Sequence, residues 1–229
     1  MSEPEVSRVM RLKVWGDNAC FTRPEMKVER VSYDVMTPSA ARGILEAILW
    51  KPAIKWHIKQ IDVLKAIRWE SVRRNEVGVV MSTDLAITAM KKGSGNLGVY
   101  VEDERQQRAG LFLKDVSYTI HAYFELTEKA GPADTVIKFQ EMFLRRAEKG
   151  QCFNRPYLGC REFSAHFEPL LQGQELPETF NGLPERLDLG WMLHDLDFSK
   201  GLPNPRFFRA VLEKGRMTVP RFDSNEVRG

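Results

Sequence analysis

YDVMTPSAARGILEAILWKP, residues 33–52, carries the clearest structural signal in this chain. Thr37 has the side chain of a helix N-cap, and Pro38 takes the first helical position, where its missing N–H costs nothing. From Ala40 onward apolar residues recur at helical spacing, as on a helix with one broad buried face. Pro52 ends the helix, because a proline disfavours helical geometry in the residue before it.

Strand patterns lie on both sides of this helix. Residues 9–15 alternate apolar and basic side chains, and residues 54–67 begin with a similar alternation. Residues 109–126 give the strongest strand pattern, with one apolar and one polar face. A second helix is predicted from a cap at Asp134 through Lys149. Its expected buried stripe consists of Val136, Ile137, Gln140, Phe143, Leu144 and Ala147.

The order of these elements predicts an α+β fold. Residues 1–155 are expected to form a ferredoxin-like βαββαβ domain, with a mobile insertion at about residues 75–107. A strand that starts near Tyr157 would close the sheet. Residues 156–229 are expected to combine this closing strand with a small antiparallel β domain, because several short strand patterns follow, the last a strand pair at 207–220.

The composition is that of an ordinary globular protein. Apolar residues make up 43% of the 229 residues and charged residues 28%, and no apolar run approaches the ~20 residues of a membrane-spanning helix. The polar N-terminus is unlike a signal peptide. Cys20, Cys152 and Cys160 form no CxxC pair and leave one cysteine over in any disulfide scheme. We therefore expect a reduced cytoplasmic protein with no membrane contact.

The sequence contains no standard catalytic motif and instead intersperses basic residues with aromatic ones. The four histidines have no partner at metal-ligand spacing, so neither a metal nor a cofactor is expected. Basic and aromatic residues cluster around Trp56 and Trp69 and again in residues 145–161. Cations bind phosphates and aromatic faces stack on unpaired bases, which favours recognition of single-stranded or hairpin RNA. Solvated charges over core aromatics explain each cluster alone equally well.

Three motifs carry a resemblance to a known family. They are SYDVMTPSAARGILEAILWKP at residues 32–52, LKDVSYTIHAYFEL at 113–126 and GQCFNRPYLGCREF at 150–163. Together they resemble the type I-C CRISPR-associated family five, d subtype, a member of the RAMP superfamily. The resemblance implies an endoribonuclease that cuts CRISPR precursor RNA at the base of each repeat hairpin without a metal. It also implies that the protein stays on the 5′ handle of the crRNA and joins the other subunits of the type I-C surveillance complex.

The implied chemistry is attack by the RNA's own 2′-hydroxyl on the adjacent phosphate. Such a reaction needs a base near the hydroxyl and cations for the charge of the transition state. In a branch of the family the catalytic set is a tyrosine in the first helix and an adjacent Lys-His pair on the second. In this sequence Leu49 stands at the tyrosine position, Lys138 matches the lysine, and Phe139 stands at the histidine position.

The candidate site residues follow from this departure. Lys138 is predicted to stabilise the transition state electrostatically, with a solvated helix lysine as the equally good alternative. Substitutes for the missing base are Tyr33, His57 and His121. The residues expected to contact the RNA backbone are Arg42, Lys51, Arg145, Arg146 and Arg155.

A second function from a different class stays open. The chain would then be a subunit that only binds the 5′ handle of the crRNA, as the missing tyrosine and histidine suggest. A basic surface of this kind would also allow secondary binding to duplex DNA.

Overall fold

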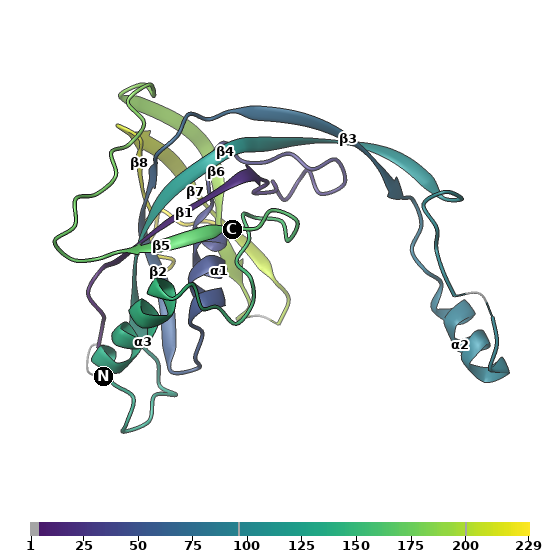
Figure 1. The fold of residues 1–229 in the computed structure, drawn as a ribbon, viewed down its shortest axis with the longest axis horizontal. Coiled ribbons are helices and arrows are strands. Elements are labelled where there is room, and N and C mark those ends of the chain that lie inside the picture. The colour runs from purple at the N-terminus through teal and green to yellow at the C-terminus, as the bar shows by residue number, and fades with distance from the viewer. Residues whose placement is uncertain (1–4, 96, 200) are drawn as a thin grey trace.

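The computed structural model describes residues 5–95, 97–199 and 201–229, and its sheet is built around helix α1 (Pro38–Ile48) as the sequence predicts (Figure 1). The Thr37 hydroxyl accepts a hydrogen bond from the amide of Ala40 at 3.3 Å, so the predicted N-cap is confirmed. The helix buries one face against the sheet, and this face includes Ile44 and Leu45.

The carboxyl end of α1 has no glycine cap and is satisfied by other parts of the chain. The carbonyl oxygens of residues 47–49 accept, in order, from the Phe153 amide at 2.8 Å, the Arg146 guanidinium at 3.0 Å and the Trp56 indole at 2.9 Å. Helix ends leave such carbonyls without intrahelical partners, so these three bonds stabilise the end of the helix. We call the carbonyl groups of residues 47–49, together with the three groups that donate to them, the α1 terminus.

Within the described residues, eight strands form a single antiparallel sheet in the order β5-β1-β4-β2-β8-β7-β6, with β3 paired to β4 outside that path. The strands are β1 (Met10–Ala19), β2 (Ile54–Val63), β3 (Trp69–Val77), β4 (Arg105–Leu126), β5 (His166–Leu170), β6 (Arg186–Asp197), β7 (Asn204–Glu213) and β8 (Arg216–Thr218). The helices that follow α1 are α2 (Thr83–Lys92) and α3 (Val136–Glu148). Trp56, Phe124 and Phe143 pack together where α3 covers the sheet.

The carboxyl-terminal strands extend the sheet. The predicted strand pair at 207–220 is confirmed as β7 and β8, with Lys214 and Gly215 in the turn at positive φ. Strand β8 also pairs with β2, where Ile61 lies opposite Met217. Strand β8 thereby joins β6 and β7 to the main sheet, and the small antiparallel β domain stays a prediction. The division of the chain near residue 155 stays a prediction.

The predicted insertion at 75–107 is more regular than expected. Strand β3 pairs with β4 from Trp69 opposite Leu113 to Val77 opposite Arg105, so both ends of the segment are strand. The sequence does not predict this strand, because no position of β3 is buried and no apolar alternation therefore marks it. Figure 1 shows this hairpin carrying α2 away from the body, and we call residues 69–113 the arm.

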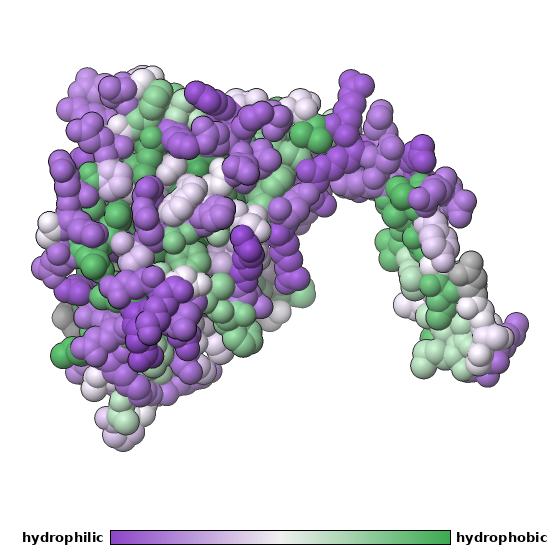
Figure 2. All heavy atoms as spheres, viewed as in Figure 1, coloured by the Kyte–Doolittle hydropathy of each residue, from purple (hydrophilic) through white to green (hydrophobic). Residues whose placement is uncertain are grey.

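Apolar side chains gather on the outer part of the arm (Figure 2). Helix α2 has no buried residue. Leu85 and Met90 on the helix and Val80 just before it are exposed apolar side chains. Within the described residues no helix is long and apolar enough to cross a membrane.

Helix α3 begins one residue later than predicted. Its N-cap is Thr135, whose hydroxyl accepts from the amide of Lys138 at 3.3 Å. The Asp134 carboxylate instead accepts from the Gly131 amide at 3.1 Å, so the predicted cap was wrong. The predicted stripe was also partly wrong, because Ile137 is 66% exposed. The buried side chains are Phe139, Phe143 and Ala147, spaced four residues apart.

The predicted strand near Tyr157 is not where the edge strand beside β1 begins, because that strand starts at His166. It is β5, which pairs antiparallel to β1 from Trp15 opposite His166 to Arg11 opposite Leu170. Residues 157–163 instead form a turn-rich segment that packs on β1, where the Cys20 amide donates to the Leu158 carbonyl at 3.0 Å.

Candidate functional site

Two of the three predicted bases are buried in hydrogen-bonded positions. Tyr33 is 1% exposed, its hydroxyl accepts from the Leu193 amide at 3.2 Å, and the Arg23 guanidinium lies 4.5 Å from the ring centre. Burial raises the pKa of Tyr33, which further opposes its ionisation. This position argues against Tyr33 as a base that contacts RNA.

His121 is buried as well, although its predicted strand face was expected to be solvated. Its Nε2 lies 2.8 Å from Oδ2 of Asp62, which is also buried. The Gln60 amide donates to the other Asp62 oxygen at 2.6 Å. His121 therefore belongs to an internal polar network, in which each buried group has a partner.

The positions that correspond to the missing tyrosine and histidine lie in the core. Leu49 is 0% exposed and Phe139 is 2% exposed, with the Phe139 ring 6.3 Å from that of Phe124. Lys138 is partly exposed, and its Nζ donates to Asp134 Oδ1 at 2.9 Å and to the Ala133 carbonyl at 3.2 Å. Of the three positions, only Lys138 carries a polar group that solvent or RNA can reach.

The five predicted RNA-binding cations divide into two kinds. Arg42 binds Asp195 through two hydrogen bonds and Arg146 donates to the α1 terminus, so both guanidinium groups serve the fold. The other three, Lys51, Arg145 and Arg155, are exposed. These three remain the better candidates for phosphate contacts.

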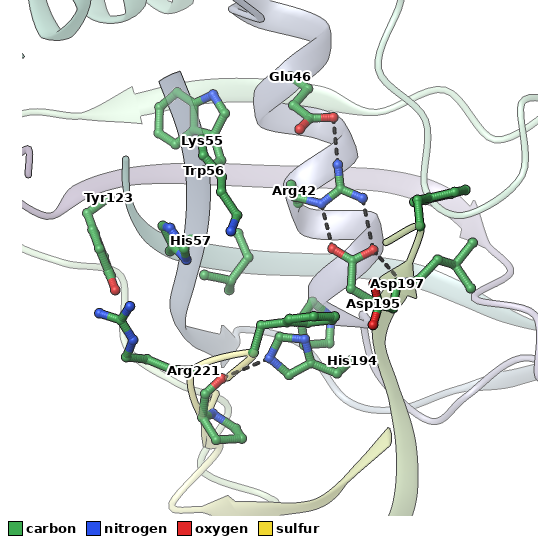
Figure 3. A pocket seen from close by; sticks show the side chains of 16 residues that line it. Arg42, Glu46, Lys55, Trp56, His57, Tyr123, His194, Asp195, Asp197 and Arg221 are labelled. Atoms are coloured by element: carbon green, nitrogen blue, oxygen red, sulfur yellow. Dashed lines mark hydrogen bonds and ion pairs between the residues drawn. The ribbon is translucent and has the colours of Figure 1, made fainter. Parts of the chain in front are cut away.

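A cleft of about 340 Å³ brings together side chains that lie far apart in the sequence (Figure 3). It is lined by one side of α1, the first residues of β2, Tyr123 of β4, the end of β6 and the loop at residues 220–222. The lining residues are Pro38, Arg42, Glu46, Lys55, Trp56, His57, Ile58, Tyr123, His194, Asp195, Leu196, Asp197, Phe198, Pro220, Arg221 and Phe222. His57 is the one predicted base that lines it.

His57 lies in the cleft as a neutral imidazole. Its ring stacks on Tyr123 with centres 5.1 Å apart, and its Nε2 lies 3.0 Å from Glu125 Oε1 without the alignment of a hydrogen bond. Burial lowers the pKa of His57 and outweighs the opposite effect of Glu125. The imidazole can therefore accept a proton near neutral pH.

Two cations accompany this histidine. The Lys55 ammonium lies 3.9 Å from the Glu125 carboxylate, and Figure 3 shows the Arg221 side chain directed toward Tyr123. Arg221 also pairs with Asp223 at 3.2 Å, on the exposed side of the loop. The cleft thus combines a neutral base, a phenol and two cations.

His194 forms another wall of the cleft. Its Nε2 lies 2.8 Å from the Pro220 carbonyl oxygen, which ties β6 to the carboxyl-terminal loop. Burial lowers its pKa as well, and its Nδ1 has no hydrogen-bond partner among the described residues. Because Nε2 is paired with the Pro220 carbonyl and Nδ1 is buried away from solvent, His194 is better suited to holding the loop than to moving a proton.

Sequence reasoning found His57 but missed its neighbours. Tyr123 lies on the polar face of the predicted strand 109–126, so the alternation contained its signal. Arg221 comes from the carboxyl-terminal loop, where no periodic pattern marks it. No group of three His, Cys, Asp or Glu side chains that could hold a metal ion occurs within residues 5–95, 97–199 and 201–229.

Comparison with known proteins identifies the family. The sequence model of the CRISPR-associated protein Cas5 family, Cas5d type, matches residues 9–220. The chain belongs to the Cas5d family. The predicted resemblance is therefore confirmed, and it spans nearly the whole sheet.

Two curated Cas5d relatives cover almost the whole chain. The protein from Mannheimia succiniciproducens is 56% identical over 226 residues, covering 96% of this chain and 98% of the relative. The protein from Thermus thermophilus is 43% identical over 229 residues, covering 92% and 91%. Both are named CRISPR pre-crRNA endoribonuclease Cas5d. A crystal structure of a CRISPR-associated protein has the same fold, with a TM-score of 0.71, 23% identity and full coverage of both chains.

Proposed function

We propose that this Cas5d chain is a pre-crRNA endoribonuclease that cuts CRISPR repeat RNA at the base of its hairpin, by attack of a 2′-hydroxyl and without a metal. Membership of the family and the names of its two relatives support the activity. The observation that carries the assignment to a site is His57, stacked on Tyr123 in a cleft that also holds Lys55 and Arg221; burial lowers the pKa of this histidine, which favours its neutral form.

In the proposed reaction His57 takes the proton of the 2′-hydroxyl, whose oxygen attacks the adjacent phosphorus. The bond from phosphorus to the 5′-oxygen breaks, and this oxygen takes a proton from water. The products are a 2′,3′-cyclic phosphate and a 5′-hydroxyl end. Lys55 and Arg221 would stabilise the extra negative charge on the phosphate oxygens in the transition state. Positioned proton transfer of this kind contributes about 10²–10⁴-fold to a rate.

Lys138 keeps the electrostatic role predicted from the sequence. Its ammonium lies on Asp134, whose pKa is lowered by that contact first and by Lys51 to a smaller extent. Both cations favour the ionised form of Asp134, and we call Lys138 and Lys51 the basic region at the start of α3. We propose that this region binds the RNA backbone beside the cut.

We also infer that the amino-terminal part of the sheet is ferredoxin-like. The elements β1, α1, β2, β4, α3 and β5 follow one another as βαββαβ if the arm is left out, and β1 and β4 are central in the order β5-β1-β4-β2. This order supports the inference, because the two helical crossovers then connect strands that are not neighbours.

After cleavage the protein would stay on the 5′ handle of the crRNA and join the other subunits of a type I-C surveillance complex. The exposed cations Lys51, Arg145 and Arg155 support retention of the handle, and would also allow secondary binding to duplex DNA.

A second candidate is a subunit that binds the 5′ handle but does not cut. It is favoured by one observation, namely that Leu49 and Phe139 put apolar core side chains where the family branch has its tyrosine and histidine. Neither side chain can transfer a proton.

The test compares cognate repeat RNA in excess EDTA with a copy that is 2′-deoxy at the nucleotide 5′ of the cut. We expect one cut in the native RNA and none in the deoxy copy. His57→Gln should reduce the single-turnover rate by about 10²–10⁴-fold. The matched control is His166→Gln, because His166 is exposed on β5 and stacks on Trp15 outside the cleft. Tight binding of both RNAs without a cut would favour the handle-binding subunit.

A further inference from the structure

Two large aromatic side chains project into solvent at the α1 terminus. Trp50 is 61% exposed and Phe153 is 88% exposed. Aromatic residues of this size bury most of their surface in folded proteins, so two such exposures at one point of the fold need an explanation.

The backbone that carries these two side chains is well held. The Phe153 amide donates to the Ala47 carbonyl at 2.8 Å, in the last turn of α1, and Trp50 follows that turn directly. The Trp56 indole and the Arg146 guanidinium fix the two carbonyls between them. Both aromatics therefore start from an ordered backbone, which lowers the entropy cost of using them in binding.

The surroundings of these aromatics are basic. Residues 145–155 contain four cations and one acidic residue, Glu148. Three of the cations, Arg145, Lys149 and Arg155, are exposed, and the exposed Lys51 follows Trp50 in the chain. Charge of this sign attracts a phosphate backbone, and would repel a protein surface that is itself basic.

We propose that Trp50 and Phe153 form a stacking site for unpaired bases of the repeat RNA, in the single-stranded segment that adjoins the hairpin. The inference rests on the proposed function for the identity of the RNA. Exposed aromatic faces bind bases by stacking, and neighbouring cations bind the phosphates between them. Stacking tolerates any base, so this site would hold the strand in position while base pairing in the hairpin and contacts in the cleft select the cut.

The experiment uses the full chain and repeat RNA that is 2′-deoxy at the cut, so that binding is measured without cleavage. The fluorescent base 2-aminopurine replaces each single-stranded position beside the hairpin in turn. We expect strong quenching at one or two positions, and its loss there in Trp50→Leu and Phe153→Leu. Each variant should also bind about 5- to 150-fold more weakly, the range that stacking of one base supports. The salt dependence of binding should not change, because no phosphate contact is removed.

Two further variants make the outcome decisive. Phe153→Trp should keep the quenching and the affinity that Phe153→Leu loses, because the tryptophan ring can also stack on a base. At 88% exposure the larger ring has room, so the fold should not be disturbed. Trp191→Leu is the matched control, because Trp191 is an exposed tryptophan on β6 that packs under Arg228. Unchanged quenching in both leucine variants would overturn the proposal, as would equal loss in Trp191→Leu. If the native RNA is not cut but quenching follows this pattern, the nuclease assignment fails and the stacking site stands.

Discussion

Replacing Arg42 should destabilise the protein and leave the salt dependence of RNA binding unchanged. The Arg42 Nε and Nη2 atoms donate to the two oxygens of Asp195 at 2.6 and 2.9 Å, and Nη1 donates to Glu46 at 2.7 Å. The two bonds to Asp195 join α1 to the end of β6 across one wall of the cleft, and the bond to Glu46 lies within α1. Arg42→Met keeps the length of the side chain and removes all three bonds.

The expected cost follows from burial. The side chains of Arg42, Asp195 and Glu46 are 30%, 18% and 28% exposed, which places them between surface and buried ion pairs. Breaking an exposed pair costs about 0.2–1 kcal/mol and breaking a buried one about 3–5 kcal/mol. We therefore expect about 2 kcal/mol for Arg42→Met. A chain of this size loses about 2–4 °C of Tm per kcal/mol, so Tm should fall by about 4–8 °C.

Thermal unfolding and RNA titrations at several salt concentrations measure the two effects separately. Lys51→Met is the matched control, because Lys51 is exposed and belongs to the proposed RNA-binding set. It should leave Tm unchanged and reduce the slope of log affinity against log salt by about 0.7–0.9. The double variant Arg42→Met/Asp195→Leu should recover part of the lost stability, because it removes the more buried of the two carboxylates and leaves only Glu46, which is 28% exposed, without its partner. A reduced salt slope with an unchanged Tm in Arg42→Met would refute this reasoning and make Arg42 a phosphate contact.

Three other substitutions test the site and its frame. Because burial holds the pKa of His57 below its ordinary value near 6.5, the cleavage rate should stay level down to that pH and fall only below it, and His57→Gln should remove this acid limb from the pH–rate profile. Arg146→Met should cost about 1–2 kcal/mol in urea unfolding, because the Ile48 carbonyl loses its partner, whereas Arg145→Met should cost less than about 0.5 kcal/mol; equal losses would contradict the capping role. Tyr33→Phe should lower stability by about 1 kcal/mol and leave the cleavage rate unchanged, and a large loss of rate at full RNA saturation would return Tyr33 to the list of bases.

The elements that sequence predicted well are those whose signals are local. The N-cap of α1, the long strand β4 and the turn between β7 and β8 each depend on residues close together in the chain. Helix α3 was predicted but placed in the wrong frame, because Asp134 and Thr135 are both good caps and only the structure shows which hydroxyl or carboxylate faces the helix. The sequence does not predict strand β3, because the strand has no apolar face and is formed by its pairing with β4.

The candidate site was harder to predict because tertiary contacts assemble it. Alternation suggested that His57 faces outward, but only the fold stacks it on Tyr123 and brings Arg221 from the carboxyl-terminal loop. The same limit applies to Arg42, which the sequence predicts to be an RNA contact. A basic residue beside a glycine on a helix looks free until its partner Asp195, 153 residues away in the chain, is known.

The buried positions of Leu49 and Phe139 bear directly on where the chemistry can lie. A hydroxyl or imidazole at either position would need a partner or a path to solvent, and both positions are now filled by apolar side chains that pack in the core. The proposed reaction therefore takes its proton transfer from another group that RNA can reach. Of the three predicted bases, Tyr33 and His121 are held in internal hydrogen bonds, whereas His57 lines a cleft with two cations. In the proposed reaction Lys138, which precedes Phe139 on α3 and is exposed, can bind phosphate, while the base comes from His57 on strand β2 and not from either helix.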